Sequence, residues 1–268
     1  MATSDILIAV IGVTGAGKTS FISRATGRQD LLIGYDIDSC TQQVIPVTYS
    51  INGRTVTLID TPGFDDSQRS ELSILQLVAD YMERTYAEGK LLSGIIMMQP
   101  LNETRLTGSE RTRTTLFKKL LGEDAYQRVV IAPTMWDHLD DNTARLRESQ
   151  RMQREDVWGD MVSRGAVVVR HSDAVQSATD IVHRFLAFDT TVELLVQREL
   201  TQNGGQLALT SAGKHLDQNM AATIQKLTQQ VEQLQGSIEA AELRGKIAVL
   251  EAEQRMLRER RWWRCVVM

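Results

Sequence analysis

Short apolar runs rich in β-branched residues alternate with longer stretches of helical periodicity over about the first 190 residues. This alternation is typical of a doubly wound, mostly parallel α/β sheet. Six runs are expected to form strands, at residues 6–11, 44–49, 56–59, 92–98, 129–132 and 167–169. Helices are expected after Lys18 and at residues 71–87, 109–121, 147–164 and 175–187.

The second and third of these strands are joined by Asn52-Gly53. This dipeptide tolerates the positive φ angles of a tight two-residue hairpin. The sequence therefore predicts one antiparallel strand in the otherwise parallel sheet.

A long polar helix is expected after the break at Asn203-Gly204-Gly205. Its apolar positions alternate at spacings of three and four, as in a coiled-coil seam. They are Ile224, Leu227, Val231, Leu234 and Ile238, followed in a shifted phase by Leu243, Ile247, Leu250 and Leu257. Gly236 and Gly245 weaken the helix near this shift. Two interpretations stay open: an interrupted coiled coil, or one amphipathic helix packed on the preceding domain.

The composition fits one α/β domain with an added helical region. The chain has 268 residues, of which 42% are hydrophobic, and a formal net charge of -4, which gives no reason to expect a nucleic-acid partner. The two cysteines, Cys40 and Cys265, suggest no disulfide framework and fit an intracellular, reducing compartment. No signal peptide is expected, and no apolar run approaches the ~20 residues that span a bilayer. The expected organisation is a nucleotide-binding domain over residues 1–190, a helical region over 191–258 and a basic tail over 259–268.

A phosphate-binding loop is predicted between the first strand and the first helix. The sequence from Gly12 to Thr19 is GVTGAGKT, which matches the pattern GxxxxGK[ST] in the expected strand–loop–helix setting. Its glycines allow backbone N–H groups and the helix N-terminus to face a phosphate. Lys18 adds a positive charge for the β- and γ-phosphates, and Thr19 offers a hydroxyl to Mg²⁺.

Two further segments are expected to complete the phosphate and metal site. Asp60-Thr61-Pro62-Gly63 is a DxxG motif at a strand end, where Asp60 can hold a water of Mg²⁺ and Gly63 N–H can meet the γ-phosphate. Thr41, in the polar loop between the first helix and the hairpin, is the candidate for the first switch loop. The predicted metal set is Thr19, Thr41 and Asp60, and the predicted catalytic set is Lys18, Thr41 and Gly63.

Four motifs occur in the order GVTGAGKT, SCTQQV, DTPGF and TMWD. The chain also has a Gly94-Ile95-Ile96 strand followed by Arg105, and Ser177-Ala178 after TMWD. The sequence therefore resembles TRAFAC-class GTPases, and more narrowly the fungal G-domain proteins related to septins and to GIMAP-type (immunity-associated) GTPases. The resemblance covers roughly residues 5–190, continues into the helical tail, and implies that GTP or GDP binds with Mg²⁺. The predicted nucleotide-binding residues are Gly12, Gly15, Ala16, Gly17, Lys18, Thr19, Ser20, Thr134, Trp136 and Asp137.

The resemblance gives Asp137 the role of accepting hydrogen bonds from guanine N1 and N2, for which a carboxylate is suited. Met135 departs from the family, which usually has a lysine along the base at this position. A thioether can lie on the ring, and Trp136 can stack nearby. His171 and Ser172 follow the last strand, where the fifth, base-contacting loop is expected.

Hydrolysis is expected to be slow, because Phe64 occupies the position after DxxG where Ras-like enzymes have a water-orienting glutamine. The septin and GIMAP resemblance implies that a partner or a second copy completes the site across the nucleotide face. Gln68, Arg69 and Arg105 are candidates to act there, with ordinary surface residues as the alternative. A homodimer through the coiled coil is the other expected association.

The chain ends with Cys265-Val266-Val267-Met268, which fits the C-a-a-X signal for farnesylation of Cys265. Arginines from Arg255 to Arg264 and the pair Trp262-Trp263 precede it, and both favour an anionic membrane surface. A prenyl chain needs such a second signal for stable attachment. We therefore expect a peripheral protein on the cytoplasmic face of a membrane.

Three functions fit the sequence. The first is a GTPase switch or scaffold at a membrane, and the second is a nucleotide-stabilised protein that assembles as septins do, with little turnover. The third, a P-loop kinase or ATPase, has no use for TMWD or CVVM and is the least favoured.

Overall fold

The computed structural model describes residues 5–31, 43–64, 69–102, 107–188, 190–234 and 238–259. It forms two compact units, Met1–Leu194 and Leu195–Met268. The predictions for Thr41, Gln68, Arg105 and Cys265, and for the tail from residue 260 onward, lie outside the described residues.

The first unit is built on a six-stranded sheet with the order β2-β3-β1-β4-β5-β6. Its strands are β1 (Ile6–Gly12), β2 (Ile45–Ile51), β3 (Arg54–Asp60), β4 (Gly94–Pro100), β5 (Val129–Thr134) and β6 (Val167–Val168). β2 is antiparallel to β3, and the other neighbouring strands are parallel. Asn52 and Gly53 form the two-residue turn, with φ angles of 52° and 74°. The predicted fold class and its antiparallel strand are confirmed.

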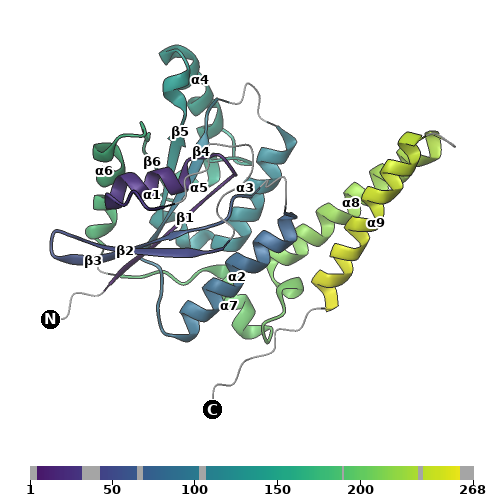
Figure 1. Ribbon diagram of the computed structural model, residues 1–268, viewed down its shortest axis with the longest axis horizontal. Coiled ribbons are helices and arrows are strands. Elements are labelled where there is room, and N and C mark those ends of the chain that lie inside the picture. The colour runs from purple at the N-terminus through teal and green to yellow at the C-terminus, as the bar shows by residue number, and fades with distance from the viewer. Residues whose placement is uncertain are drawn as a thin grey trace. The chain divides into compact units, whose positions relative to one another are not determined.

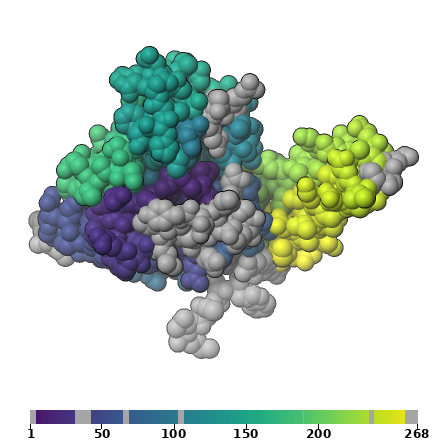
Figure 2. Space-filling model, turned by 45° about the horizontal axis from the view of Figure 1, so that its top comes forward, coloured from purple at the N-terminus to yellow at the C-terminus, as the bar shows by residue number. Residues whose placement is uncertain are grey.

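Helices cover both faces of this sheet (Figure 1). Its helices are α1 (Lys18–Thr26), α2 (Glu71–Ala87), α3 (Gly108–Leu121), α4 (Asp141–Met152), α5 (Gly159–Ser163) and α6 (Val175–Leu186). Two short 3-10 helices, η1 (Glu123–Arg128) and η2 (Trp136–His138), flank β5. The space-filling view shows α1 in purple and α6 in green on the same face of this unit (Figure 2).

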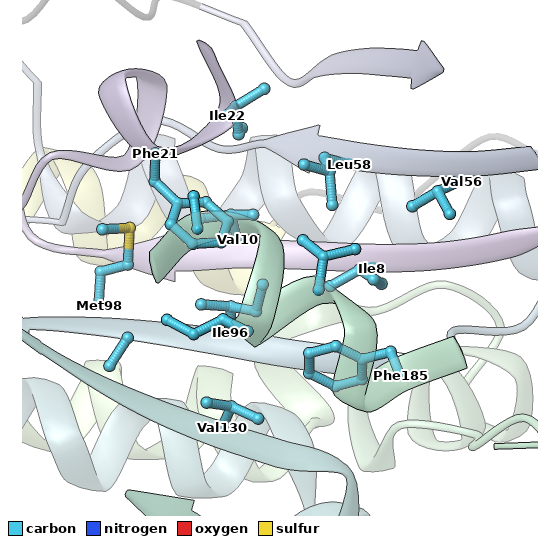
Figure 3. Close-up of a cluster of buried hydrophobic side chains, with 14 of the residues drawn as sticks. Ile8, Val10, Phe21, Ile22, Val56, Leu58, Ile96, Met98, Val130 and Phe185 are labelled. Atoms are coloured by element: carbon cyan, nitrogen blue, oxygen red, sulfur yellow. The ribbon is translucent and has the colours of Figure 1, made fainter. Parts of the chain in front are cut away.

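The core on that face is formed by alternate residues of the central strands together with α1 and α6. Ile8 and Val10 of β1, for example, lie near Ile96 of β4 (Figure 3). Phe21 of α1 and Phe185 of α6 close the cluster and are completely buried. The alternation of side chains along a strand explains why one set faces these helices and the other set faces α2 and α3. This packing fixes the carboxyl ends of β1, β3 and β5, where the site lies.

The helix predicted over residues 147–164 is wrong, because the chain forms two helices, α4 and α5, with a turn between them. The turn buries Trp158 completely and places the Arg151 guanidinium 6.0 Å from its ring. Arg151 also forms a buried bidentate pair with Glu110 of α3, at 2.8 and 3.1 Å. A Cβ on Gly159 would lie 2.8 Å from the Met152 carbonyl oxygen, so the tight return requires glycine. The free energy gained by burying Trp158 therefore outweighs the helix propensity of residues 153–158, and the helix is interrupted there.

The second unit contains α7 (Leu195–Gln202), the 3-10 helix η3 (Leu207–Leu209), α8 (Ser211–Gln233) and α9 (Ile238–Glu259). α8 and α9 pack as an antiparallel hairpin: Arg258 of α9 forms a bidentate ion pair with Asp217 of α8, both contacts at 2.9 Å. Ile238, predicted in the seam, is the first residue of α9 and is 84% exposed, whereas Leu257 is buried. The predicted C-terminal helical region is therefore present as two helices, and the alternative of a single amphipathic helix is wrong. No described helix is long and apolar enough to cross a bilayer.

Candidate functional site

The phosphate-binding loop joins the end of β1 to the N-terminus of α1. Gly17 has a φ of 88° and caps α1, a conformation that glycine adopts without strain. A Cβ on Gly12 would lie 2.5 Å from the Met98 carbonyl oxygen of β4, so only glycine fits where the loop leaves the strand. Ala16 is completely buried under the loop. The loop thus directs the N–H groups that begin α1 to one point above the sheet, as phosphate binding requires.

Lys18 lies at the floor of this loop and is only 7% exposed. Its Nζ donates hydrogen bonds to the carbonyl oxygens of Gly12 at 3.2 Å and Val13 at 2.9 Å. These contacts hold the ammonium inside the curve of the loop and close to the helix N-terminus. A charge held in this way is suited to phosphate oxygens.

Thr19 and Asp60 meet at the front of the loop, where Thr19 Oγ1 donates a 2.7 Å hydrogen bond to Asp60 Oδ2. The register of β1 with β3, in which Val10 pairs with Asp60, brings the two motifs together. A hydroxyl and a carboxylate are hard oxygen ligands, as Mg²⁺ prefers, and phosphate oxygens and water would complete its shell. Two of the three residues predicted at the metal are thus adjacent, and Thr41 lies outside the described residues.

The end of the DxxG motif pairs with the phosphate-binding loop. Thr14 N donates to Phe64 O at 3.1 Å, and Phe64 N donates to Gly12 O at 3.2 Å. A Cβ on Gly63 would lie 2.4 Å from Thr14 N, so this approach requires glycine. Thr14 was not among the predicted site residues, and its hydroxyl also donates to Gly63 O at 3.3 Å. Thr14 occupies a variable position of the GxxxxGK[ST] pattern, so the motif does not predict its contact with Gly63.

Phe64 is completely buried and packs edge-to-face on Phe117 of α3, with ring centroids 4.9 Å apart. Its side chain is therefore part of the core. An apolar ring in this position cannot orient a water molecule. Arg69 lies just before Ser70, the N-cap of α2.

The base loop, residues 134–139, begins at the last residue of β5. Thr134 Oγ1 donates a 3.2 Å hydrogen bond to Ala16 O and so ties this loop to the phosphate-binding loop. Met135 has a φ of 55°, which is uncommon for a residue other than glycine. Asp137 is exposed, so its carboxylate is accessible to a ligand.

The fifth loop, residues 170–174, lies beside the base loop. Trp136 Nε1 donates to His171 O at 3.2 Å. His171 is buried, and its Nδ1 lies 3.1 Å from Ser177 Oγ of α6. Burial lowers the pKa of the His171 imidazole, partly opposed by Asp173, so the ring is neutral near pH 7. Ser172 N–H donates to Ser177 Oγ at 3.2 Å, so α6 supports the whole loop.

Sequence reasoning missed Arg170, which precedes His171. Its guanidinium carbon lies 4.9 Å from the Trp136 ring centroid, and it forms an ion pair with Glu148 of α4. An arginine after a strand gives no signal by itself. Its role appears only when α4, the base loop and the fifth loop are seen together.

Known proteins similar in sequence to this chain are GTPases or GTP-binding proteins. Residues 7–104 match the family model described as 50S ribosome-binding GTPase, a range that includes the phosphate-binding loop and DTPG and ends before the base loop. GTP-binding protein A from Dictyostelium discoideum is 30% identical over 129 residues, which are 47% of this chain and 27% of that protein. The match thus spans about a quarter of that relative.

Solved structures share the fold. Toc33 from Arabidopsis thaliana in complex with GDP and Mg²⁺ superposes with a TM-score of 0.54 and 13% identity, covering 67% of this chain and 85% of that chain. A structure concerning the chloroplast translocon components atToc33 and psToc159, for whose GTPase activity dimerization is important, gives a TM-score of 0.56 and 13% identity, with 71% and 86% covered.

The family-model match and the curated relative support the predicted P-loop GTPase, while the narrower resemblance to septins and GIMAP-type proteins stays a prediction. The sheet order and the superposition on Toc33 show that the chain has the fold of P-loop GTPases, and its residues 7–104 match a GTPase family model.

Proposed function

We propose that this protein binds GTP and GDP with Mg²⁺ at the site described, hydrolyses GTP slowly, and acts as a membrane-tethered switch or scaffold. The observation that carries the proposal is the convergence of three groups on one edge of the sheet. Lys18 is held inside the phosphate-binding loop, Thr19 contacts Asp60, and Thr134 ties the exposed Asp137 to the same loop. Phosphate, metal and base would thus be bound by connected segments.

Slow hydrolysis is supported by the burial of Phe64 against Phe117. The residue directly after DxxG is Phe64 and not a glutamine that could orient the attacking water. A second copy or a partner would then supply the missing group across the nucleotide face, as dimerization matters for the translocon GTPases of the same fold. A nucleotide-stabilised assembly protein with little turnover is the alternative, and the same buried Phe64 favours it.

We expect phosphate release from GTP on the order of 10⁻³ s⁻¹ or slower in dilute protein, the range of an unassisted small GTPase. If a second copy assists, the rate per molecule should rise as protein concentration increases. Phosphate release should be measured over a hundredfold concentration range, with oligomeric state measured in GDP and in a non-hydrolysable GTP analogue. A fast rate independent of concentration would contradict the proposal. Nucleotide-dependent assembly with no turnover would favour the alternative.

Membrane tethering is proposed from the C-terminal sequence alone. Cys265→Ser removes the prenyl acceptor, so the protein expressed in eukaryotic cells should move from the membrane to the soluble fraction at any ionic strength. Replacing Arg260, Arg261 and Arg264 should instead weaken binding mainly to anionic vesicles at low salt, while Arg258 is kept because it pairs with Asp217. Cys40→Ser is the matched control and should fractionate like the unaltered protein. Equal membrane fractions for Cys265→Ser and the unaltered protein would contradict the lipid anchor.

A further inference from the structure

We propose that Trp136 and Arg170 are positioning residues that determine base specificity: they hold the base loop so that Asp137 meets guanine in a protein whose loop carries Met135. This inference rests on the proposed function, because it concerns how the same site selects its nucleotide. The indole of Trp136 in the base loop and the guanidinium of Arg170 in the fifth loop would together fix the orientation of Asp137.

The base loop needs support from outside itself. Met135 has a φ of 55°, a strained conformation that persists only when surrounding contacts enforce it. Within the loop, Leu139 N donates to Trp136 O at 3.1 Å, and His138 N donates to Met135 O at a long 3.4 Å. Asp137 is exposed, so packing does not fix its carboxylate. The direction of Asp137 therefore depends on how its neighbour Trp136 is held.

Trp136 is tied to a rigid anchor. Its Nε1 donates to the carbonyl oxygen of His171, whose own N–H donates to Pro133 O of β5 at 2.9 Å. The His171 ring packs edge-to-face on Phe21 of α1, with centroids 5.1 Å apart. The acceptor for Trp136 is thus fixed by the sheet, by α6 through Ser177 and by the helix that follows the phosphate-binding loop.

Arg170 covers the indole of Trp136. Its guanidinium carbon lies 4.9 Å from the ring centroid, within the distance at which a cation is attracted to an aromatic face. Glu148 orients the guanidinium by accepting from Arg170 Nε at 2.7 Å and from a terminal nitrogen. These two charged side chains are 26% and 14% exposed, so water screens their pair only in part.

The resulting chain of contacts runs from α4 through Glu148 and Arg170 to Trp136 and ends next to Asp137. An ordinary stabilising cluster would support the domain as a whole and would affect every nucleotide equally. A positioning cluster acts through Asp137, so its loss should weaken guanine binding and leave phosphate binding intact. This difference can be measured.

The test compares Kd values for GDP and ADP by titration calorimetry on the full chain with Mg²⁺. Trp136→Leu removes both the Nε1 hydrogen bond and the cation–π contact, and Arg170→Gln removes the cation–π contact and the link to Glu148. Each variant should lower the preference for GDP over ADP by about tenfold. Affinity for ADP should change less than twofold. Trp136→Phe keeps the ring and loses only the N–H donor, so about a threefold loss is expected.

Two controls separate positioning from general stability. Arg164 forms surface ion pairs with Glu123 and Asp160, away from the base loop, and Arg164→Gln should leave both affinities unchanged. In an Asp137→Asn background, Trp136→Leu should reduce GDP affinity by less than twofold, because its effect acts through Asp137.

The proposal is overturned if the Trp136 and Arg170 variants keep the full preference for GDP, if they weaken ADP and GDP equally, or if their effects add fully to Asp137→Asn. In all these cases GDP binding by the unaltered protein would leave the proposed function standing. Failure of the unaltered protein to prefer GDP over ADP would remove both proposals.

Discussion

Lys18→Ala is expected to weaken GDP and GTP binding by about 10- to 150-fold. The ammonium would bind phosphate oxygens, and a hydrogen bond to a charged group contributes about 1.5–3 kcal/mol. The same change also removes the hydrogen bonds from Nζ to Gly12 O and Val13 O, so the conformation of the loop is less well fixed. Affinities should be measured by titration of nucleotide-free protein with GDP.

The fold should survive this change, because α1 and the core cluster do not depend on the ammonium. Circular dichroism and thermal unfolding without nucleotide should therefore resemble those of the unaltered protein. Lys90→Ala is the matched control: Lys90 is an exposed lysine paired with Glu88, and its loss should not alter nucleotide affinity. Unchanged GDP binding by a folded Lys18→Ala protein would mean that the loop does not hold phosphate.

Asp137→Asn is expected to reverse the base preference. A carboxylate accepts hydrogen bonds from guanine N1 and N2, whereas an amide offers one acceptor and one donor. The donor suits the oxygen that xanthine carries in place of the guanine amino group. We expect GDP affinity to fall by roughly 10- to 100-fold, from about 1.5–3 kcal/mol for a charged hydrogen bond, and xanthosine diphosphate affinity to rise.

Asp141→Asn is the control for this second prediction. Asp141 begins α4, four residues after Asp137, and pairs at the surface with Arg145. The control should leave base preference unchanged, so any general effect of removing a nearby charge is measured separately. The base assignment is wrong if Asp137→Asn keeps the preference for GDP over xanthosine diphosphate.

Much of the fold could be predicted from local sequence. The apolar runs identified all six strands within a few residues, and Asn52-Gly53 identified the hairpin because its two positive φ angles leave few alternatives. The break between α4 and α5 could not be predicted, because it depends on tertiary contacts. Trp158, Arg151 and Glu110 come together only after α3 has packed against α4.

In the site, too, some residues could be predicted from local sequence and others depend on tertiary packing. The phosphate-binding loop and DTPG are contiguous motifs, so their residues and chemistry follow from spacing alone. The contact between Thr19 and Asp60 follows from parallel pairing of β1 with β3, which the doubly wound pattern implies. Arg170 contacts Trp136 from the fifth loop and is held by Glu148 of α4, and neither residue belongs to a motif. Their role depends on packing and could not be predicted.

The most direct test of the central claim compares the affinities of the unaltered, nucleotide-free protein for GDP and ADP in Mg²⁺. If Asp137 selects guanine, GDP should bind at least ten times more tightly than ADP, which is the effect of about 1.4 kcal/mol. Equal affinities for the two nucleotides, or tighter binding of ADP, would contradict the account of this site as a guanine nucleotide site.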